Sequence, residues 1–150
     1  MDVRVVEDYQ GFLALEDSWN ELWKGHCADN VFLHFRWARA FVESFALREK
    51  LYVLAAYDGV SLRAILPLVN DEGSLRFIGS PRSDYADLIC SSEEAPAALE
   101  SIFGALGARG DWRRLKILDI PERSPIRRCF RDNPRITKRV FWQPSSKCPG

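Results

Sequence analysis

The chain has 150 residues, of which 47% are hydrophobic and 28% are charged, and its formal net charge is zero. This length and composition fit one folded domain and exclude a disordered chain, collagen or a coiled coil as a description of the whole. The longest unbroken apolar run, residues 51–57, is far shorter than the roughly 20 residues of a membrane helix. The N-terminus also lacks the layout of a signal peptide, so we expect a cytoplasmic protein without a membrane segment.

Cysteine and histidine are too scattered to predict metal or redox chemistry. The four cysteines form no CxxC pair, and the two histidines, His26 and His34, lie in one short region without further ligands. Zinc and thioredoxin-type sites need closely spaced thiols. We therefore expect reduced, unpaired thiols and no metal site.

Charge is distributed unevenly along the chain. Residues 1–108 contain 9 Lys/Arg and 17 Asp/Glu, whereas residues 109–150 contain 12 Lys/Arg and 4 Asp/Glu. Such asymmetry suggests either a surface that binds an anionic partner or a basic end that packs against the acidic part of the same chain. We favour the second interpretation.

The N-terminal third predicts one short strand followed by two helices. Residues 3–6 form a β-branched strand. From Gln10 onward, helical spacing predicts a helix with one buried stripe, made by Phe12, Leu15, Trp19, Leu22 and Trp23. A second helix is predicted by the spacing of Trp37, Ala40, Phe41, Ser44 and Phe45.

The middle of the chain predicts an antiparallel three-stranded meander over residues 51–79. An apolar strand at residues 51–57 is closed by Asp58-Gly59, a strong hairpin signal. The following strand, residues 62–69, contains Pro67, which indicates an edge, a bulge or a splayed end because proline has no N–H to donate. The turn at residues 70–73 leads into a third strand at residues 75–78.

The remaining segments alternate between strands and helices. A polar loop, residues 79–85, precedes a possible strand at 86–90, and a helix opened by Glu93-Glu94 ends at Gly107 or Gly110. Residues 115–120 form a strand, Ser124-Pro125 begins a short basic helix, and residues 136–142 alternate as a last strand. We therefore predict an α+β domain with a mixed sheet over residues 1–142 and a frayed tail over 143–150.

Several segments, in this order, resemble a known family. They are Trp19-x-x-Leu22, Phe35-Arg36-Trp37, the meander, the block Gly79-Ser80-Pro81-x-Ser83-Asp84-Tyr85-x-Asp87-Leu88, and Trp112 with the strand that follows. Together, over roughly residues 10–125, they resemble the N-terminal half of FemAB/CelD-like acyltransferases of the GNAT superfamily, bacterial proteins often labelled as cellulose-biosynthesis CelD-type. The block at residues 79–88 is the most specific part.

The resemblance implies a GNAT-like mixed sheet and an acetyl-CoA-dependent N- or O-acetyltransferase, with this chain as the acceptor-recognising half. It also implies a second GNAT-like domain or partner subunit, in which the acyl donor usually binds. GNAT proteins hold the acetyl-CoA pyrophosphate on backbone N–H groups of a glycine-rich loop that opens a helix. Residues 76–81 end in Pro81 and do not lead into a helix, and residues 107–110 end a helix. We therefore do not expect this chain to bind acetyl-CoA alone.

The polar loop carries the candidate residues for binding a small-molecule or saccharide-like acceptor. Asp84 can accept a hydrogen bond from an amine or hydroxyl, and Tyr85 can stack on the acceptor or donate a proton. The other candidates are Ser80, Ser83 and Trp37. The alternative is that Ser83 and Asp84 cap a turn and that Tyr85 and Trp37 only pack. A non-catalytic binding domain of the same fold is the alternative function.

The basic helix provides weak candidates for binding a cofactor phosphate. Arg127 and Arg128 each lie about one turn from Arg131. The alternative is a solvated or internally paired surface, which we favour. No nucleic-acid-binding motif is present, and neither a nucleophile elbow nor a phosphate-binding loop appears, so the sequence does not identify a general base and makes nucleic-acid binding the least favoured function.

Overall fold

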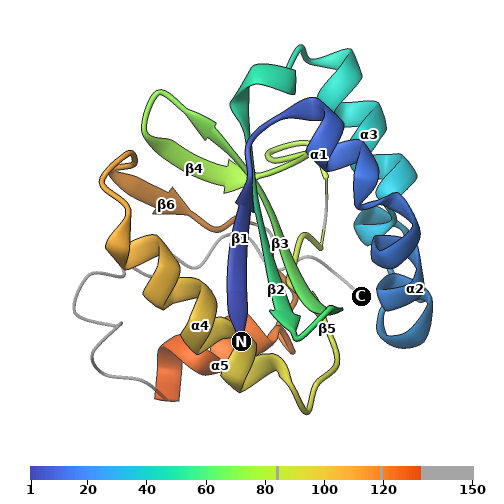
Figure 1. Ribbon diagram of the computed structural model, residues 1–150, viewed down its shortest axis with the longest axis vertical. Coiled ribbons are helices and arrows are strands. Elements are labelled where there is room, and N and C mark those ends of the chain that lie inside the picture. The colour runs from blue at the N-terminus through green and yellow to red at the C-terminus, as the bar shows by residue number, and fades with distance from the viewer. Residues whose placement is uncertain (84, 119, 133–150) are drawn as a thin grey trace.

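The computed structural model describes residues 1–83, 85–118 and 120–132, and within them the fold is α+β with a mixed six-stranded sheet (Figure 1). The main strand order is β1-β2-β3-β4-β6, and β5 pairs with β3 beyond the end of β4. Every described pairing is antiparallel except that of β4 with β6. The strands are β1 (Asp2–Val6), β2 (Leu51–Asp58), β3 (Ser61–Asp71), β4 (Ser74–Phe77), β5 (Ile89–Cys90) and β6 (Arg114–Lys116).

The predicted meander is confirmed as β2, β3 and β4. Gly59 closes the first hairpin with a φ of 61°, and Glu72 and Gly73 close the second with φ of 54° and 90°. These left-handed conformations suit the two-residue turns that match strand twist. The hairpin signals were therefore sufficient to predict both connections.

Pro67 lies in β3, the central strand, rather than at an edge of the sheet. It stands at the point where two other strands, β4 and β5, follow one another along the same side of β3. Its carbonyl accepts a hydrogen bond from the Ile78 N–H at 2.9 Å. The nitrogen and carbonyl of one strand residue face the same neighbour, so the proline nitrogen faces this side. There β3 pairs with β4 from Leu68 onward and with β5 at Ala64 and Ile65. The missing donor thus coincides with the gap between two partner strands.

Helices cover both faces of the sheet (Figure 1). On one face lie α1 (Tyr9–Ala14), α2 (Glu16–His26), the 3-10 turn η1 (Val31–Leu33) and α3 (Phe35–Ser44), and on the other lie α4 (Ala95–Ala108) and α5 (Pro125–Asp132). A second 3-10 turn, η2 (Arg48–Lys50), leads into β2. Among the described residues, no helix combines the length and apolarity needed to cross a membrane.

The two covered faces give the sheet two cores. Along β2, Leu51 and Val53 pack towards α1–α3, whereas Tyr52, Leu54 and Ala56 pack towards α4 and α5. Because successive side chains of a strand point to opposite faces, a strand covered on both faces is apolar throughout. This explains the unbroken run at residues 51–57.

The single helix predicted from Gln10 is wrong, because two helices occupy this segment. α1 ends at Ala14 and α2 begins at Glu16, with Leu15 between them. The Leu15 N–H bonds to the carbonyl of Phe12, three residues back, at 3.1 Å. This tighter turn redirects the chain while Phe12, Leu15 and Trp19 all remain buried.

The apolar stripe predicted for the second helix is not its core face. α3 buries Phe35, Ala38 and Val42 against the sheet side, and Phe35 lies 4.8 Å from Phe12 between ring centroids. Both sets of residues have helical spacing, so periodicity alone could not choose between them. The predicted residues form a second, partly exposed aromatic face that includes Trp37, Phe41 and Phe45.

The later elements are shorter than predicted. β5 has two residues rather than the five of 86–90, and β6 covers Arg114–Lys116 rather than 115–120. α4 ends at Ala108, between the two predicted glycine stops, and α5 begins at Pro125 as predicted. The predicted last strand and the tail, residues 136–150, lie outside the described residues.

Candidate functional site

The loop that follows β4, residues 79–83, lies on the aromatic face of α3. The indole Nε1 of Trp37 donates a 2.7 Å hydrogen bond to Oγ of Ser83. The Arg82 guanidinium lies 5.2 Å from the centre of the Phe45 ring. Phe41 lies between Trp37 and Phe45: its ring is tilted against Trp37 at 5.7 Å and stacked on Phe45 at 5.3 Å between centroids. The aromatic face that the core does not use is therefore the support for this loop.

Gly79 allows the loop to turn at this place. Its φ is +96°, and a Cβ atom there would lie 2.3 Å from Oγ of Ser83. A side chain at residue 79 would therefore be strained in its backbone and would also collide with Ser83. The glycine thus brings Ser83 within reach of Trp37.

A shallow pocket of about 370 Å³ lies next to this loop. It is lined by Asp29, Asn30, Val31, Phe32, Tyr85 and Pro121. We call it the Tyr85 pocket. Its walls come from three segments: residues 29–32 before α3, Tyr85 after the loop, and Pro121 before α5. Phe32 also contacts Trp37 edge to face, at 5.0 Å between centroids, so the pocket adjoins the aromatic face.

Asn30 holds the first two walls together. Its Nδ2 donates to the backbone carbonyl of Tyr85 at 2.8 Å, and its Oδ1 accepts from the N–H of Phe32 at 3.2 Å. Tyr85 has a φ of 55°, an uncommon conformation for a tyrosine. Such conformations persist only where the surroundings determine them, and the bond from Asn30 is one such constraint.

A hydrogen bond between Asp87 and Ser124 connects the segment that follows the loop to the start of α5. The Ser124 hydroxyl donates to Oδ1 of Asp87 at 2.6 Å, and the Leu88 N–H donates to the same oxygen at 2.8 Å. Oγ of Ser124 also accepts from the Ile126 N–H at 3.1 Å, which caps the helix as its sequence predicts. Burial is the main effect on the Asp87 carboxyl and raises its pKa to about 6.

The structure brings together some of the predicted site residues. Trp37 and Ser83 are in contact, and Tyr85 lines the pocket. Ser80 is buried, its Oγ has no hydrogen-bond partner among the described residues, and it does not line the pocket. Asp84 lies outside the described residues.

Sequence reasoning missed the other pocket residues. Asn30 and Phe32 lie between the two helices predicted for the N-terminal third, and Pro121 lies between the predicted strand at 115–120 and the basic helix. Only the Asn30 amide, a side chain that commonly bonds to nearby backbone, offered a local signal. Its partner Tyr85 is 55 residues away, and no periodicity predicts such a contact.

The residues of the loop do not fit an acetyl-CoA pyrophosphate. The N–H groups of Arg82 and Ser83 both donate to the carbonyl of Gly79 at 2.8 Å, and that of Ser80 donates to Phe77. Pro81 has no N–H, and the chain continues to β5 rather than into a helix. The N–H groups of Ser80, Arg82 and Ser83 are therefore bonded within this segment of the chain. The other candidate, residues 107–110, lies at the end of α4 as predicted.

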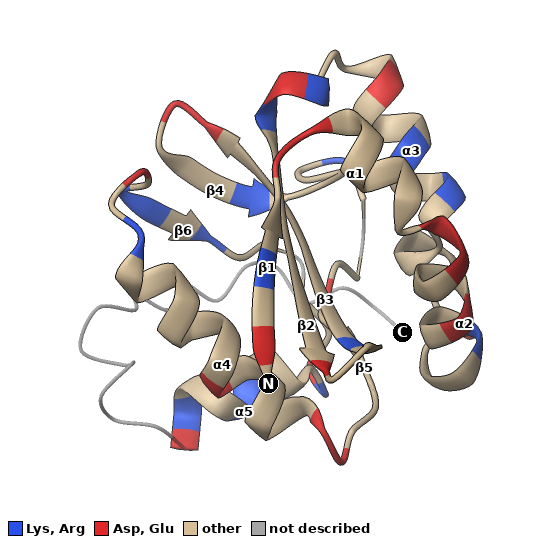
Figure 2. Cartoon of the chain, viewed as in Figure 1, with Lys and Arg blue, Asp and Glu red and all other residues tan. Residues whose placement is uncertain are grey.

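The basic residues of α5 lie on its outer surface. Arg127, Arg128 and Arg131 are exposed, while Ile126 and Phe130 face the core. Figure 2 shows acidic positions along α2 and basic positions on α3, β6 and α5. Arg131 contacts Asp132 at 3.3 Å. None of these arginines lines the Tyr85 pocket.

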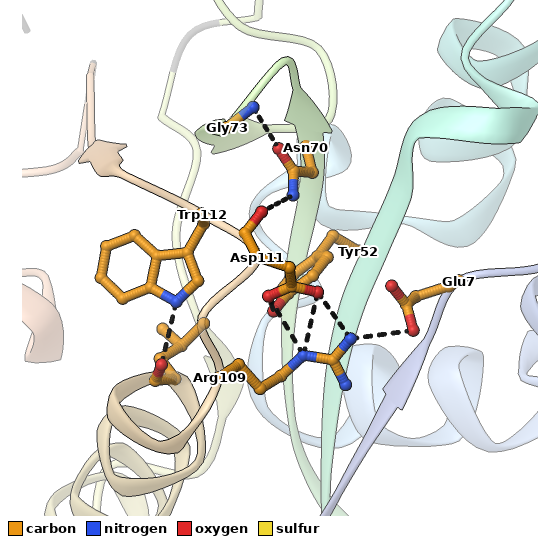
Figure 3. Close-up of polar contacts among 8 residues, drawn as sticks. Glu7, Tyr52, Asn70, Gly73, Arg109, Asp111 and Trp112 are labelled. Atoms are coloured by element: carbon orange, nitrogen blue, oxygen red, sulfur yellow. Dashed lines mark hydrogen bonds and ion pairs between the residues drawn. The ribbon is translucent and has the colours of Figure 1, made fainter.

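A second polar cluster lies where α4 ends (Figure 3). The buried Tyr52 donates its hydroxyl proton to Asp111 at 2.8 Å, and Arg109 bonds to Asp111 at 2.7 Å and to Glu7 at 3.1 Å. Burial and the bond to Asp111 raise the pKa of Tyr52 to about 12, and Arg109 lowers the pKa of Asp111. Tyr52 therefore keeps its proton at neutral pH. The cluster joins β1, β2 and the α4–β6 connection rather than forming an acid–base site.

The described cysteines are free and unactivated. Cys27, Cys90 and Cys129 form no disulfide with one another, and burial raises the pKa of each, that of Cys90 to about 12. Thiols in this state are poor nucleophiles at neutral pH. Within the described part of the chain, no three His, Cys, Asp or Glu side chains come together as a metal site.

Comparison with known proteins identifies no relative. No protein-family model, curated protein or solved structure matches the chain.

Proposed function

We propose that this chain is a GNAT-like domain that recognises the acceptor of an acyl-transfer reaction. The Tyr85 pocket binds a small-molecule or saccharide-like acceptor that carries a hydroxyl or amine. A second GNAT-like domain or a partner subunit supplies the acetyl-CoA site. The proposal rests on the family resemblance and on the geometry of this pocket.

One observation carries the proposal. Tyr85, which belongs to the block with the most specific resemblance, lines the pocket, and hydrogen bonds from this block reach Asn30 in one neighbouring segment and Ser124, just after Pro121, in the other. Binding residues commonly lie on loops that a rigid scaffold supports. The mixed sheet with its antiparallel meander agrees with the GNAT-like arrangement that the resemblance implies.

The lining of the pocket suits a polar ligand with an apolar face. Phe32, Tyr85 and Pro121 provide apolar surface, and the exposed carboxylate of Asp29 accepts hydrogen bonds from hydroxyl or ammonium groups. Binding sites typically combine such apolar walls with a few polar groups that fix orientation. A sugar ring with hydroxyl or amino substituents has this chemistry.

The alternative is a non-catalytic domain that binds a ligand in the same pocket. The N–H groups of Ser80, Arg82 and Ser83 are bonded within the loop region, which is as compatible with this alternative as with an acceptor half whose acyl donor binds in another domain. Both proposals predict acceptor binding by the full chain. They differ in whether a second domain completes an acetyltransferase.

Thermal melting of the full chain with glucose, glucosamine and cellobiose tests acceptor binding. Saturation at a hundredfold excess over Kd stabilises the folded state by about 2.7 kcal/mol. Asp29→Ala removes the pocket carboxylate and abolishes the shift, whereas Glu21→Ala, on the exposed surface of α2, keeps it. If none of the three sugars raises the melting temperature, the proposed acceptor class is wrong.

A further inference from the structure

The three walls of the Tyr85 pocket come from distant segments, and two side-chain hydrogen bonds join them. Asn30 bonds to the Tyr85 carbonyl at 2.8 Å, which joins the first wall to the second. Ser124 bonds to Asp87 at 2.6 Å, which joins the second to the third. Asp87 lies two residues after Tyr85, and Ser124 lies three residues after Pro121. The Ser124 N–H donates to the Pro121 carbonyl at 3.0 Å, so the Asp87–Ser124 pair links the Tyr85 segment to the Pro121 segment.

We propose that Asp87 is a positioning residue that, through Ser124, holds the Pro121 wall against Tyr85, and that protonation of its carboxylate loosens the pocket. The inference adds a means of regulation to the proposed acceptor site and rests on that function for its biological meaning. The structural coupling itself concerns the protein without ligand.

One carboxylate oxygen of Asp87 accepts two hydrogen bonds. Oδ1 of Asp87 accepts from Ser124 and from the Leu88 N–H, and the Ser124 oxygen at the same time caps α5 through Ile126. Asp87 and Ser124 are 8% and 2% exposed. Hydrogen bonds to an ionised carboxylate are shorter and about twice as strong as neutral ones. Neutralising Asp87 therefore weakens a buried contact that water does not replace.

The surroundings of Asp87 allow its carboxylate to gain or lose a proton near neutral pH. Burial raises the pKa of Asp87 to about 6, against the lowering effect of its two hydrogen-bond donors. Among the described residues, Cys27, at the end of α2, is a titratable side chain that interacts with Asp87, and burial raises the pKa of its thiol. Cys27 thus remains neutral while Asp87 gains or loses its proton.

Nuclear magnetic resonance of the full chain without ligand, between pH 4.5 and 7.5, tests the coupling. The Leu88 backbone amide reports Asp87 ionisation directly, the Asn30 side-chain amide reports the Tyr85 wall, and Pro121 ring carbons report the third wall. We expect all three signals to shift with one midpoint near pH 6. In Asp87→Asn all three become independent of pH in this range.

The variant Ser124→Ala tests whether Asp87 acts on the Pro121 wall through Ser124 or only stabilises its own segment. Without the hydroxyl donor, the Leu88 signal still titrates, with a higher midpoint, while the Pro121 signals no longer follow it. The proposal is overturned if Leu88 titrates in the unmodified protein but Asn30 and Pro121 do not, or if Leu88 itself does not titrate. Because no acceptor is present, neither result depends on whether sugars bind.

Discussion

Trp37 and Ser83, 46 positions apart in the chain, are joined by a 2.7 Å hydrogen bond from the indole Nε1 to the serine Oγ. The bond fixes the loop after β4 to the aromatic face of α3. Ser83 is 2% exposed and Trp37 is half-buried, so the contact is partly shielded from water. It gives the candidate site a rigid support that neither residue's local sequence shows.

Ser83→Ala should lower the free energy of unfolding by about 1–2 kcal/mol, because the half-buried indole N–H loses its acceptor. Urea denaturation measures the change. A double-mutant cycle with Trp37→Phe should give a coupling energy of about 0.5–1.5 kcal/mol. Additive effects of the two substitutions would show that the bond contributes nothing.

Gly79→Ala should be among the most destabilising single substitutions in the loop. The new Cβ lies 2.3 Å from Oγ of Ser83 at a φ of +96°, which costs on the order of 2–4 kcal/mol in strain and lost contacts. Gly104→Ala is the matched control, since no atom lies within 4 Å of its Cβ position inside α4. That control should stabilise the protein by about 0.5–1 kcal/mol; equal effects at both positions would contradict the loop geometry.

Tyr52→Phe should lower the free energy of unfolding by about 1 kcal/mol at neutral pH, because the variant lacks the hydroxyl that donates to Asp111. The pKa of Tyr52 is raised to about 12 in the folded protein, against roughly 10 in an unfolded chain. The folded state therefore holds the proton more tightly, and stability falls as pH rises from 10 to 12. Alkaline denaturation should be less steep in Tyr52→Phe than in the unmodified protein.

Asp87 should make the protein more stable at pH 4.5 than at pH 7.5, apart from the contributions of other groups. Its pKa is about 6 when folded and roughly 3.9 when unfolded, so the folded state binds the proton first as pH falls. The difference corresponds to about 3 kcal/mol, which is present below pH 4 and lost as pH rises through 6. Urea denaturation at both pH values should show a smaller change for Asp87→Asn; an identical change would show that Asp87 does not titrate there.

The meander and the α+β class were predictable because their signals are local. Asp58-Gly59 and the turn at Gly73 determine the hairpins through backbone conformation, and the apolar run at 51–57 indicates a strand buried on both faces. The cap at Ser124 was predictable for the same reason. Each signal depends on residues within a few positions of one another.

The candidate site depends on distant contacts, which periodicity does not encode. α3 has two apolar stripes, and only the position of Phe12 and the sheet shows that Phe35, rather than Trp37, faces the core. The bonds Asn30–Tyr85 and Asp87–Ser124 link segments 55 and 37 residues apart. Tyr85 was a candidate from the sequence, but the walls around it were not.

The most direct test of the proposed function is calorimetric titration of the full chain with cellobiose, glucosamine and acetyl-CoA in parallel. We predict that at least one sugar binds, that Asp29→Ala abolishes this binding, and that acetyl-CoA gives no saturable heat. Saturable acetyl-CoA binding without any sugar binding would contradict the assignment of this chain as the acceptor-recognising half.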